Sequence, residues 1–166
     1  MVAYDASEWS DLFVATAGAA AALAGLVFVA VSINLKPIIA GPGLPDRALQ
    51  TVLMLLIVVV ISIVGLIPGQ DRVALGVELL VVSGCYIAGL AVTSRGSLGG
   101  PGHGQPRSWL IGRLLLLAIA SVPLLVGSIG VLVEAGGGLY WIVAGIVGAI
   151  AGGVTNAWVL LVEIQR

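Results

Sequence analysis

Charge is scarce in this sequence, since only 9% of its 166 residues are Asp, Glu, Lys or Arg. A soluble domain carries about 25% charged residues, whereas this chain is 60% hydrophobic and has a mean hydropathy of +1.18. A water-soluble fold of this size could not bury so much apolar surface. The composition therefore excludes a soluble domain and predicts an integral membrane protein.

The residues that build most enzyme and cofactor sites are also few. One cysteine and one histidine, Cys85 and His103, exclude an intrachain disulfide, a CxxC metal site and histidine-rich haem or metal ligation within the chain. There is no basic patch for nucleic acid and no GxSxG, HExxH or P-loop motif. We therefore expect no enzyme, no metal, no cofactor and no nucleic-acid partner. A cleavable signal peptide is not expected either, because the segment before the first apolar run is acidic rather than basic.

Five apolar runs are long enough to cross a membrane, for which a helix needs about 20 residues. They cover residues 12–35, 48–67, 73–93, 109–133 and 139–162, and short loops join them. A re-entrant hairpin is an alternative for the third run, which contains Glu78, although it would leave the flanking charges on one side. We expect a single all-α transmembrane domain over residues 1–166.

The basic residues predict the direction of the chain, because cytoplasmic loops are enriched in Lys and Arg. With five spans and the N-terminus outside, six of the seven basic residues fall inside and only Arg72 falls outside. With only four spans, the basic residues would no longer be concentrated on one side of the membrane. The sequence therefore predicts an N-out, C-in protein.

Side-chain size divides the five runs into two kinds. Small residues let membrane helices approach closely, and the first and last runs are rich in them. The predicted packing residues are Gly18, Ala21, Gly25, Ala144, Gly148 and Gly152. The first and last helices are thus expected at the centre of one protomer or of a homo-oligomer. The second run is bulky and aliphatic, so we expect an outer helix that faces lipid.

A few polar residues interrupt the apolar runs and are candidate sites. Glu78 is either an ion or proton contact inside the membrane or a boundary residue that reaches the outer interface. Asn156 and Thr155, near the glycines of the last run, either hydrogen-bond between helices or line a pore. Ser32 and Asn34 either cap the first helix or shape a cytoplasmic mouth.

Two further predictions concern the fourth run. Pro123 is expected to kink the helix, because proline removes a backbone hydrogen bond and frees the carbonyl near Ile119. The kink serves either packing or gating. Arg113 either extends its side chain to lipid phosphates at the inner interface or forms a salt bridge with Glu163, which lies at a similar depth near the inner end of the fifth run.

The segments GLVFVAVSINL at 25–35 and LIPGQ at 66–70 resemble stretches of uncharacterised small multi-pass membrane proteins of high-GC, actinobacterial-type bacteria. The resemblance covers the first two runs and implies a bacterial inner (plasma) membrane location. Two functions fit the sequence. One is an oligomeric channel- or transporter-like protein with a path lined by the first and fifth helices. The other is a structural or accessory subunit that binds another membrane protein through its small-residue helices.

Overall fold

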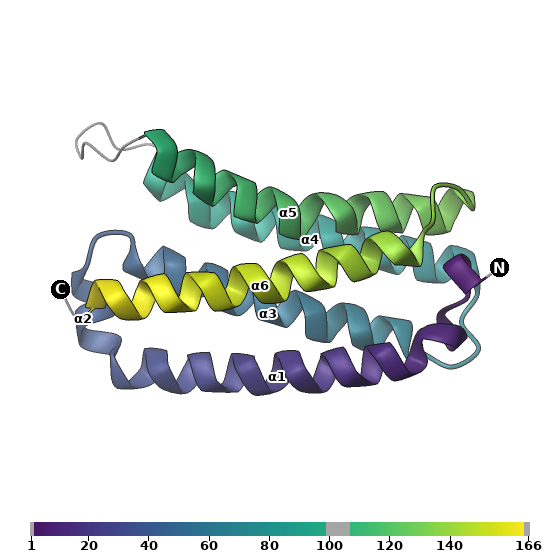
Figure 1. Ribbon diagram of the computed structural model, residues 1–166, viewed down its shortest axis with the longest axis horizontal. Coiled ribbons are helices and arrows are strands. Elements are labelled where there is room, and N and C mark those ends of the chain that lie inside the picture. The colour runs from purple at the N-terminus through teal and green to yellow at the C-terminus, as the bar shows by residue number, and fades with distance from the viewer. Residues whose placement is uncertain (1, 99–106, 165–166) are drawn as a thin grey trace.

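The computed structural model is a bundle of long helices, and it describes residues 2–98 and 107–164 (Figure 1). Two short 3-10 helices, η1 (Val2–Tyr4) and η2 (Ala6–Trp9), come first. The remaining elements are α1 (Ser10–Ile33), α2 (Leu35–Ala40), α3 (Leu44–Gly65), α4 (Arg72–Leu98), α5 (Arg107–Val133) and α6 (Leu139–Ile164). Every element in the described ranges is helical, which confirms the all-α prediction.

Five helices in the described ranges are long and apolar enough to cross a membrane. These candidate spans are Ala6–Ile33, Leu44–Gly65, Arg72–Ser94, Leu114–Val133 and Leu139–Glu163. They agree with the five predicted runs to within a few residues at most ends. The third run is one continuous helix, α4, so the re-entrant alternative is wrong. Such a set of helices is what a multi-pass membrane protein requires.

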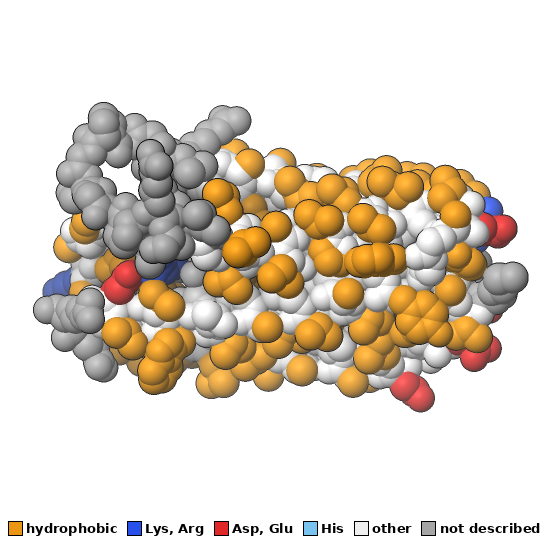
Figure 2. Space-filling view, turned by 45° about the horizontal axis from the view of Figure 1, so that its top comes forward, with side chains coloured by type: hydrophobic (Ala, Val, Ile, Leu, Met, Phe, Trp, Pro, Cys, Tyr) orange, Lys and Arg blue, Asp and Glu red, His pale blue; other side chains and the backbone are white. Residues whose placement is uncertain are grey.

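The two ends of the bundle differ in what they contain (Figure 1). The N-terminal end carries η1, η2, the α3–α4 loop and the α5–α6 turn. The α2 end carries α2 and the last turns of α6. In Figure 2, hydrophobic side chains cover the middle of the visible face, and the charged side chains gather toward the two ends.

Side chains near the end of α1 satisfy carbonyls of their own helix. Asn34, the residue between α1 and α2, donates its side-chain amide to the Ala30 carbonyl at 2.9 Å. The Ser32 hydroxyl donates to the Phe28 carbonyl at 2.8 Å. The Ala30 carbonyl also accepts the Asn34 backbone amide at 3.2 Å, so Asn34 contacts the last turn of α1 with both its backbone and its side chain.

Helix α3 lies at the centre of the bundle and contacts α1, α4 and α6 (Figure 1). In its most apolar 18 residues 56% are buried, against 11% in α1. The prediction that the second run is an outer helix is therefore wrong, and the first helix is not central within the single protomer. Bulky aliphatic side chains such as Leu55, Val58 and Ile61 are fully buried here. A uniformly apolar helix suits either lipid or protein on every side, so its composition does not tell the two apart.

Helix α6 packs between α3 and α5, and its glycines allow the close approach. A Cβ atom at Gly148 would lie 2.6 Å from the Ile119 carbonyl oxygen of α5, the carbonyl that Pro123 leaves without its helical partner. A Cβ atom at Gly152 would lie 3.1 Å from Met54 Cε of α3. Ala144 was assigned to this packing face, but it is exposed, and Gly145 contacts α5 instead.

The small residues of α1 do not pack within the chain. Gly18, Ala21 and Gly25 are all exposed, and a Cβ atom at either glycine would meet nothing within 4 Å. Their predicted packing role is therefore wrong for the single protomer. The opposite face of α1 packs on α3, where the Thr16 and Ser62 hydroxyls lie 2.9 Å apart.

A polar cluster joins three helices at the α2 end. Glu163 was expected to pair with Arg113, but its Oε2 lies 3.1 Å from Nη1 of the buried Arg47 in α3. The side chain of Arg113 lies outside the described residues. Nearby, the fully buried Gln50 donates to Thr93 at 3.1 Å and to Ser94 at 3.0 Å. These contacts tie α3 to α4 and α6.

Replacing Glu163 by Gln is expected to lower the free energy of unfolding by about 1 kcal/mol, because the buried Arg47 loses a charged partner. Unfolding in a series of SDS concentrations, followed by tryptophan fluorescence, measures this change. Glu8→Gln, at an exposed carboxylate, is the control and should leave stability unchanged. Equal effects of the two substitutions would contradict a stabilising Arg47–Glu163 pair.

Candidate functional site

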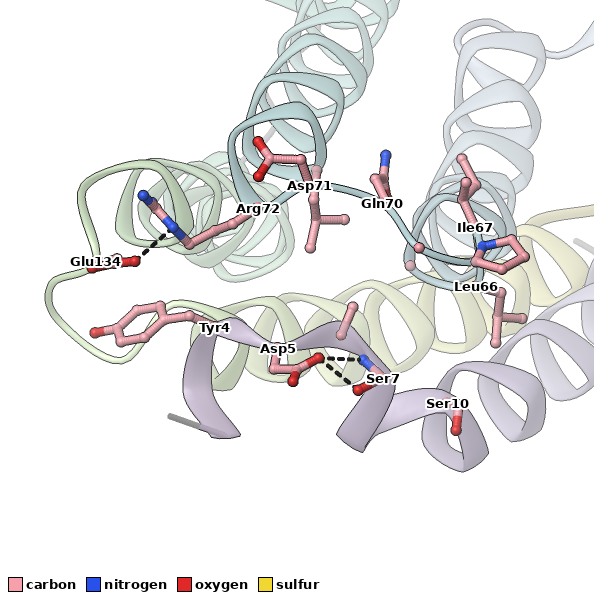
Figure 3. Close-up of a pocket in the computed structure, with 15 residues that line it drawn as sticks. Tyr4, Asp5, Ser7, Ser10, Leu66, Ile67, Gln70, Asp71, Arg72 and Glu134 are labelled. Atoms are coloured by element: carbon pink, nitrogen blue, oxygen red, sulfur yellow. Dashed lines mark hydrogen bonds and ion pairs between the residues drawn. The ribbon is translucent and has the colours of Figure 1, made fainter.

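A polar cleft of about 720 Å³ opens at the N-terminal end of the bundle (Figure 3). Its walls come from the N-terminal segment, the α3–α4 loop, the start of α4 and Glu134. Small-molecule sites have volumes of about 300–1,000 Å³. The cleft is therefore large enough for a small solute, and chain segments far apart in the sequence form it together.

The N-terminal wall of the cleft is held against α6. The Trp9 indole N–H donates to the Val2 carbonyl at 2.7 Å, and its ring meets Tyr140 edge-on with centroids 4.8 Å apart. The Tyr4 hydroxyl accepts a hydrogen bond from the Gly137 amide at 3.3 Å. These contacts fix the segment before the first span in one position.

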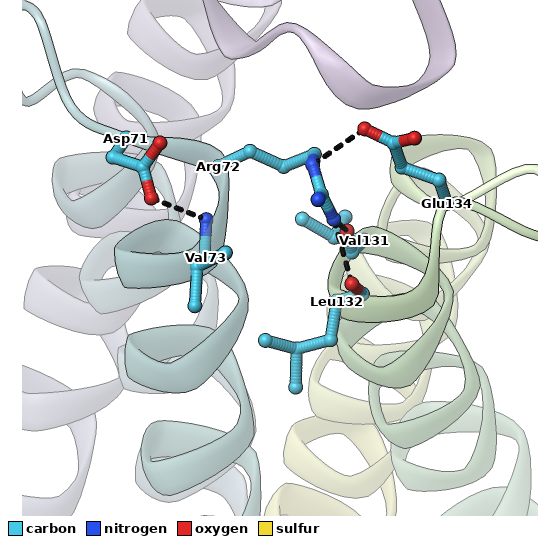
Figure 4. A network of polar contacts seen from close by, with 6 residues as sticks. All are labelled: Asp71, Arg72, Val73, Val131, Leu132 and Glu134. Carbon is cyan, nitrogen blue, oxygen red and sulfur yellow. Dashed lines mark hydrogen bonds and ion pairs between the residues drawn. The ribbon is translucent and has the colours of Figure 1, made fainter.

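A second wall is held by Arg72, the first residue of α4 (Figure 4). Its Nη1 donates to the carbonyls of Val131 and Leu132 at 2.7 and 2.6 Å, and its Nε lies 2.7 Å from Glu134 Oε1. The last carbonyls of α5 lack helical partners, and a cation is favoured at a helix C-terminus. Arg72 therefore fastens the start of α4 to the end of α5. Sequence reasoning missed this role because the main partners are backbone atoms.

Glu78 is connected to the cleft through Gln70. The Gln70 side-chain amide donates to Glu78 Oε2 at 2.6 Å, and Glu78 is half-buried on α4. Gln70 lines the cleft, and its Oε1 is buried without a hydrogen-bond partner among the described residues. An unpaired buried acceptor is costly, and this oxygen has almost no exposed surface, so a donor from the cleft reaches it only if the lining rearranges.

The cleft is rich in negative charge. Three carboxylates, Asp5, Asp71 and Glu134, line it with one guanidinium, Arg72, which gives a formal net charge of −2. Asp5 Oδ1 accepts hydrogen bonds from the Ser7 hydroxyl at 2.6 Å and the Ser7 amide at 3.0 Å. These two bonds hold the pKa of Asp5 below its ordinary value, so its carboxylate is ionised at neutral pH. The electrostatic environment therefore favours cations.

The buried face of α4 continues from the cleft into the bundle. Leu75, which lines the cleft, and Leu79 are buried. Ser83 and Tyr86 follow at intervals that keep them on this face, because residues three and four apart share one side of a helix. The Ser83 and Ser128 hydroxyls lie 3.5 Å apart between α4 and α5. The Tyr86 hydroxyl is buried without a partner among the described residues.

The other predicted polar contacts lie toward the α2 end, away from this cleft. Thr155 is exposed and donates to its own helix at the Ala151 carbonyl, at 2.8 Å, and Asn156 is half-buried. Between α1 and α6 the structure has an apolar groove of about 150 Å³, lined only by Ala, Val, Leu and Ile. A polar path lined by α1 and α6 is therefore not formed within the described protomer.

Comparisons with known proteins do not indicate a function for the cleft. No family model matches the chain, and neither curated proteins nor solved structures give a match. Among the described residues, no group of three His, Cys, Asp or Glu side chains is placed to hold a metal ion. The chemistry of the cleft itself is thus the basis for a functional proposal.

Proposed function

We propose that the chain is a transporter-like membrane protein that admits a small polar solute into the N-terminal cleft from the outer side of a plasma membrane. The observation that carries this proposal is the cleft of about 720 Å³ at one end of the bundle, with three carboxylates and one guanidinium in its lining. A protein that only fills or braces the bilayer does not need a cavity of this size lined by carboxylates.

The charge distribution supports an outward-facing cleft. Lys36 and Arg47 lie at the α2 end, whereas the N-terminal end carries Arg72 as its basic residue among those described. Lys and Arg are enriched in cytoplasmic loops. This rule favours an α2 end that faces the cytoplasm, and with it the N-out orientation expected from the sequence.

The route from the cleft into the bundle is proposed to follow α4. The Gln70–Glu78 hydrogen bond extends the polar lining onto this helix, and Ser83 and Tyr86 lie further along its buried face. Polar groups inside a membrane are costly and often mark solute or ion pathways. Leu75 and Leu79 pack tightly below the cleft, so transport requires α4 to move against its neighbours and open this layer.

Cysteine accessibility tests this route without knowledge of the solute. In a Cys85→Ala background, Ser83→Cys is expected to react slowly with a membrane-impermeant thiol reagent added from outside. Ala149→Cys is the control, because it is equally buried in α6 at a similar distance from the N-terminal end but away from α4's polar face. A Ser83→Cys that is as unreactive as Ala149→Cys from both sides would contradict transport through α4.

A second candidate function is lateral assembly, favoured by the exposed small residues of α1. Close packing through small residues drives association of membrane helices, and Gly18 and Gly25 have open space beside them. We propose a second copy of this chain as the occupant, since two such faces fit each other without charged groups. Native mass spectrometry of wild type and Gly18→Leu should show a dimer only for wild type, and a monomeric wild type would remove this candidate.

A further inference from the structure

We infer that the solute of the cleft is a small organic cation with two ammonium groups, an inference that rests on the proposed solute-binding role of the cleft.

Several of the donors that line the cleft are already occupied. Arg72 gives Nη1 to two carbonyls of α5 and places Nε against Glu134. Gln70 donates to Glu78, and the Ser7 hydroxyl donates to Asp5. A ligand that needs donors from the protein, such as a phosphate or a carboxylate, would have to compete with these contacts.

The acceptors, in contrast, keep unused capacity. Asp5 accepts both Ser7 hydrogen bonds at Oδ1, and Asp71 accepts the Val73 amide at Oδ2. A carboxylate has two oxygens and about four acceptor positions, so Oδ2 of Asp5 and Oδ1 of Asp71 remain suited to a donor. The buried Oε1 of Gln70 has no partner among the described residues, and it becomes a third acceptor only if the lining rearranges. Ammonium groups carry three donors each and no acceptor.

Charge and placement point to two ammonium groups rather than one. The lining has a formal net charge of −2, and a dication neutralises it, whereas a dianion would raise the repulsion. Asp5 belongs to the N-terminal segment and Asp71 to the α3–α4 loop, so the two carboxylates approach the cleft from different segments (Figure 3). In the proposed complex, one ammonium group of a linear diamine contacts each carboxylate. A bare metal ion is disfavoured, because the described residues offer no cluster of three acidic ligands.

Calorimetric titration of the purified protein in phosphatidylcholine nanodiscs tests the inference. The probes are 1,4-diaminobutane, the neutral 1,4-butanediol of similar length, and succinate as the dianion. We expect saturable binding of the diamine and none of the other two. Neutral lipid is used so that the amine does not bind the bilayer surface.

A matched pair of double variants assigns the binding to the cleft. Asp5→Asn with Asp71→Asn keeps an acceptor oxygen for Ser7 and Val73 but removes both charges, and we expect at least tenfold weaker diamine binding. Glu8→Gln with Asp11→Asn removes two exposed charges from the same end, outside the cleft lining, and should change affinity less than twofold.

Other results of the titration would overturn the ligand class, the location of the site or the inference as a whole. Preferential binding of succinate or butanediol, weakened in the cleft variant, would overturn the cationic class and leave the cleft as a binding site. Diamine binding that both double variants leave unchanged would overturn the assignment to the cleft, and no binding of the diamine would overturn the inference itself. The thiol reactivity of Ser83→Cys does not depend on which of these ligands binds. It therefore tests the proposed transport route separately from the ligand class.

Discussion

Gly148→Ala is expected to destabilise the bundle by about 1–3 kcal/mol, the usual cost of forcing an extra methyl group into a well-packed core. A Cβ atom at this position would lie 2.6 Å from the Ile119 carbonyl oxygen and 3.1 Å from its carbonyl carbon. Both are backbone atoms, so no side-chain rotation relieves the contact. Helices α5 and α6 must move apart, and each would lose contacts with the other.

Gly84→Ala is the matched control, since the same methyl group meets nothing within 4 Å on the exposed side of α4. Alanine favours a helix over glycine by about 1 kcal/mol in peptides, so this variant should be as stable as wild type or slightly more so. Unfolding in SDS, followed by tryptophan fluorescence, compares the two variants. A Gly148→Ala protein with wild-type stability would contradict the close α5–α6 contact.

Arg72→Met should destabilise the protein by about 3 kcal/mol, because hydrogen bonds to a charged group contribute about 1.5–3 kcal/mol each. The variant removes two hydrogen bonds to the end of α5 and the ion pair with Glu134. The carbonyls of Val131 and Leu132 are then left without these donors at a helix terminus that favours a cation. The same SDS titration measures the loss.

Arg72→Lys keeps the charge but not the forked geometry of the guanidinium, so an intermediate loss is expected. Lys36→Met removes an exposed cation at the other end of the bundle and should have little effect on stability. If Arg72→Met were no more harmful than Lys36→Met, the role of Arg72 in fastening α4 to α5 would be refuted.

Hydropathy was sufficient to predict the helices but not their neighbours. The five apolar runs correspond to five helices because a long apolar segment must satisfy its backbone hydrogen bonds internally. Which helix lies at the centre depends on fit between surfaces. Helix α3 is central because its aliphatic side chains meet α1, α4 and α6, where Gly65 makes room for Phe13 and Gly152 for Met54. Size alone pointed to α1 instead of α3 as a central helix of the protomer.

Contacts between residues far apart in the chain were the second feature that the sequence did not predict. Depth suggested Arg113 as a partner of Glu163. The side chain of Arg113 lies outside the described residues, and the structure gives Glu163 a partner that depth did not indicate, Arg47. Both arginines lie toward the same end of the bundle, and depth gives no information on which helices are neighbours. The expected polar residues Asn156 and Thr155 likewise fall on α6 without joining Glu78.

The cleft was only partly visible in the sequence. Glu78 stood out because a carboxylate is rare in an apolar run, yet its partner Gln70 lies in a loop that hydropathy treats only as a connection. Asp5 drew attention only as part of an acidic N-terminal segment. Arg72 is the one basic residue on the predicted outer side. This isolation could have indicated a structural role, because Arg72 joins the start of α4 to the end of α5.

Site-directed thiol labelling in intact cells tests most directly the claim that the cleft opens to the outside. Ala135→Cys, in the exposed α5–α6 turn beside the cleft, and Ala40→Cys, exposed at the end of α2, change no charge. In a Cys85→Ala background, an impermeant maleimide should label Ala135→Cys in intact cells and Ala40→Cys only after permeabilisation. The reverse pattern would place the cleft in the cytoplasm and contradict solute entry from outside.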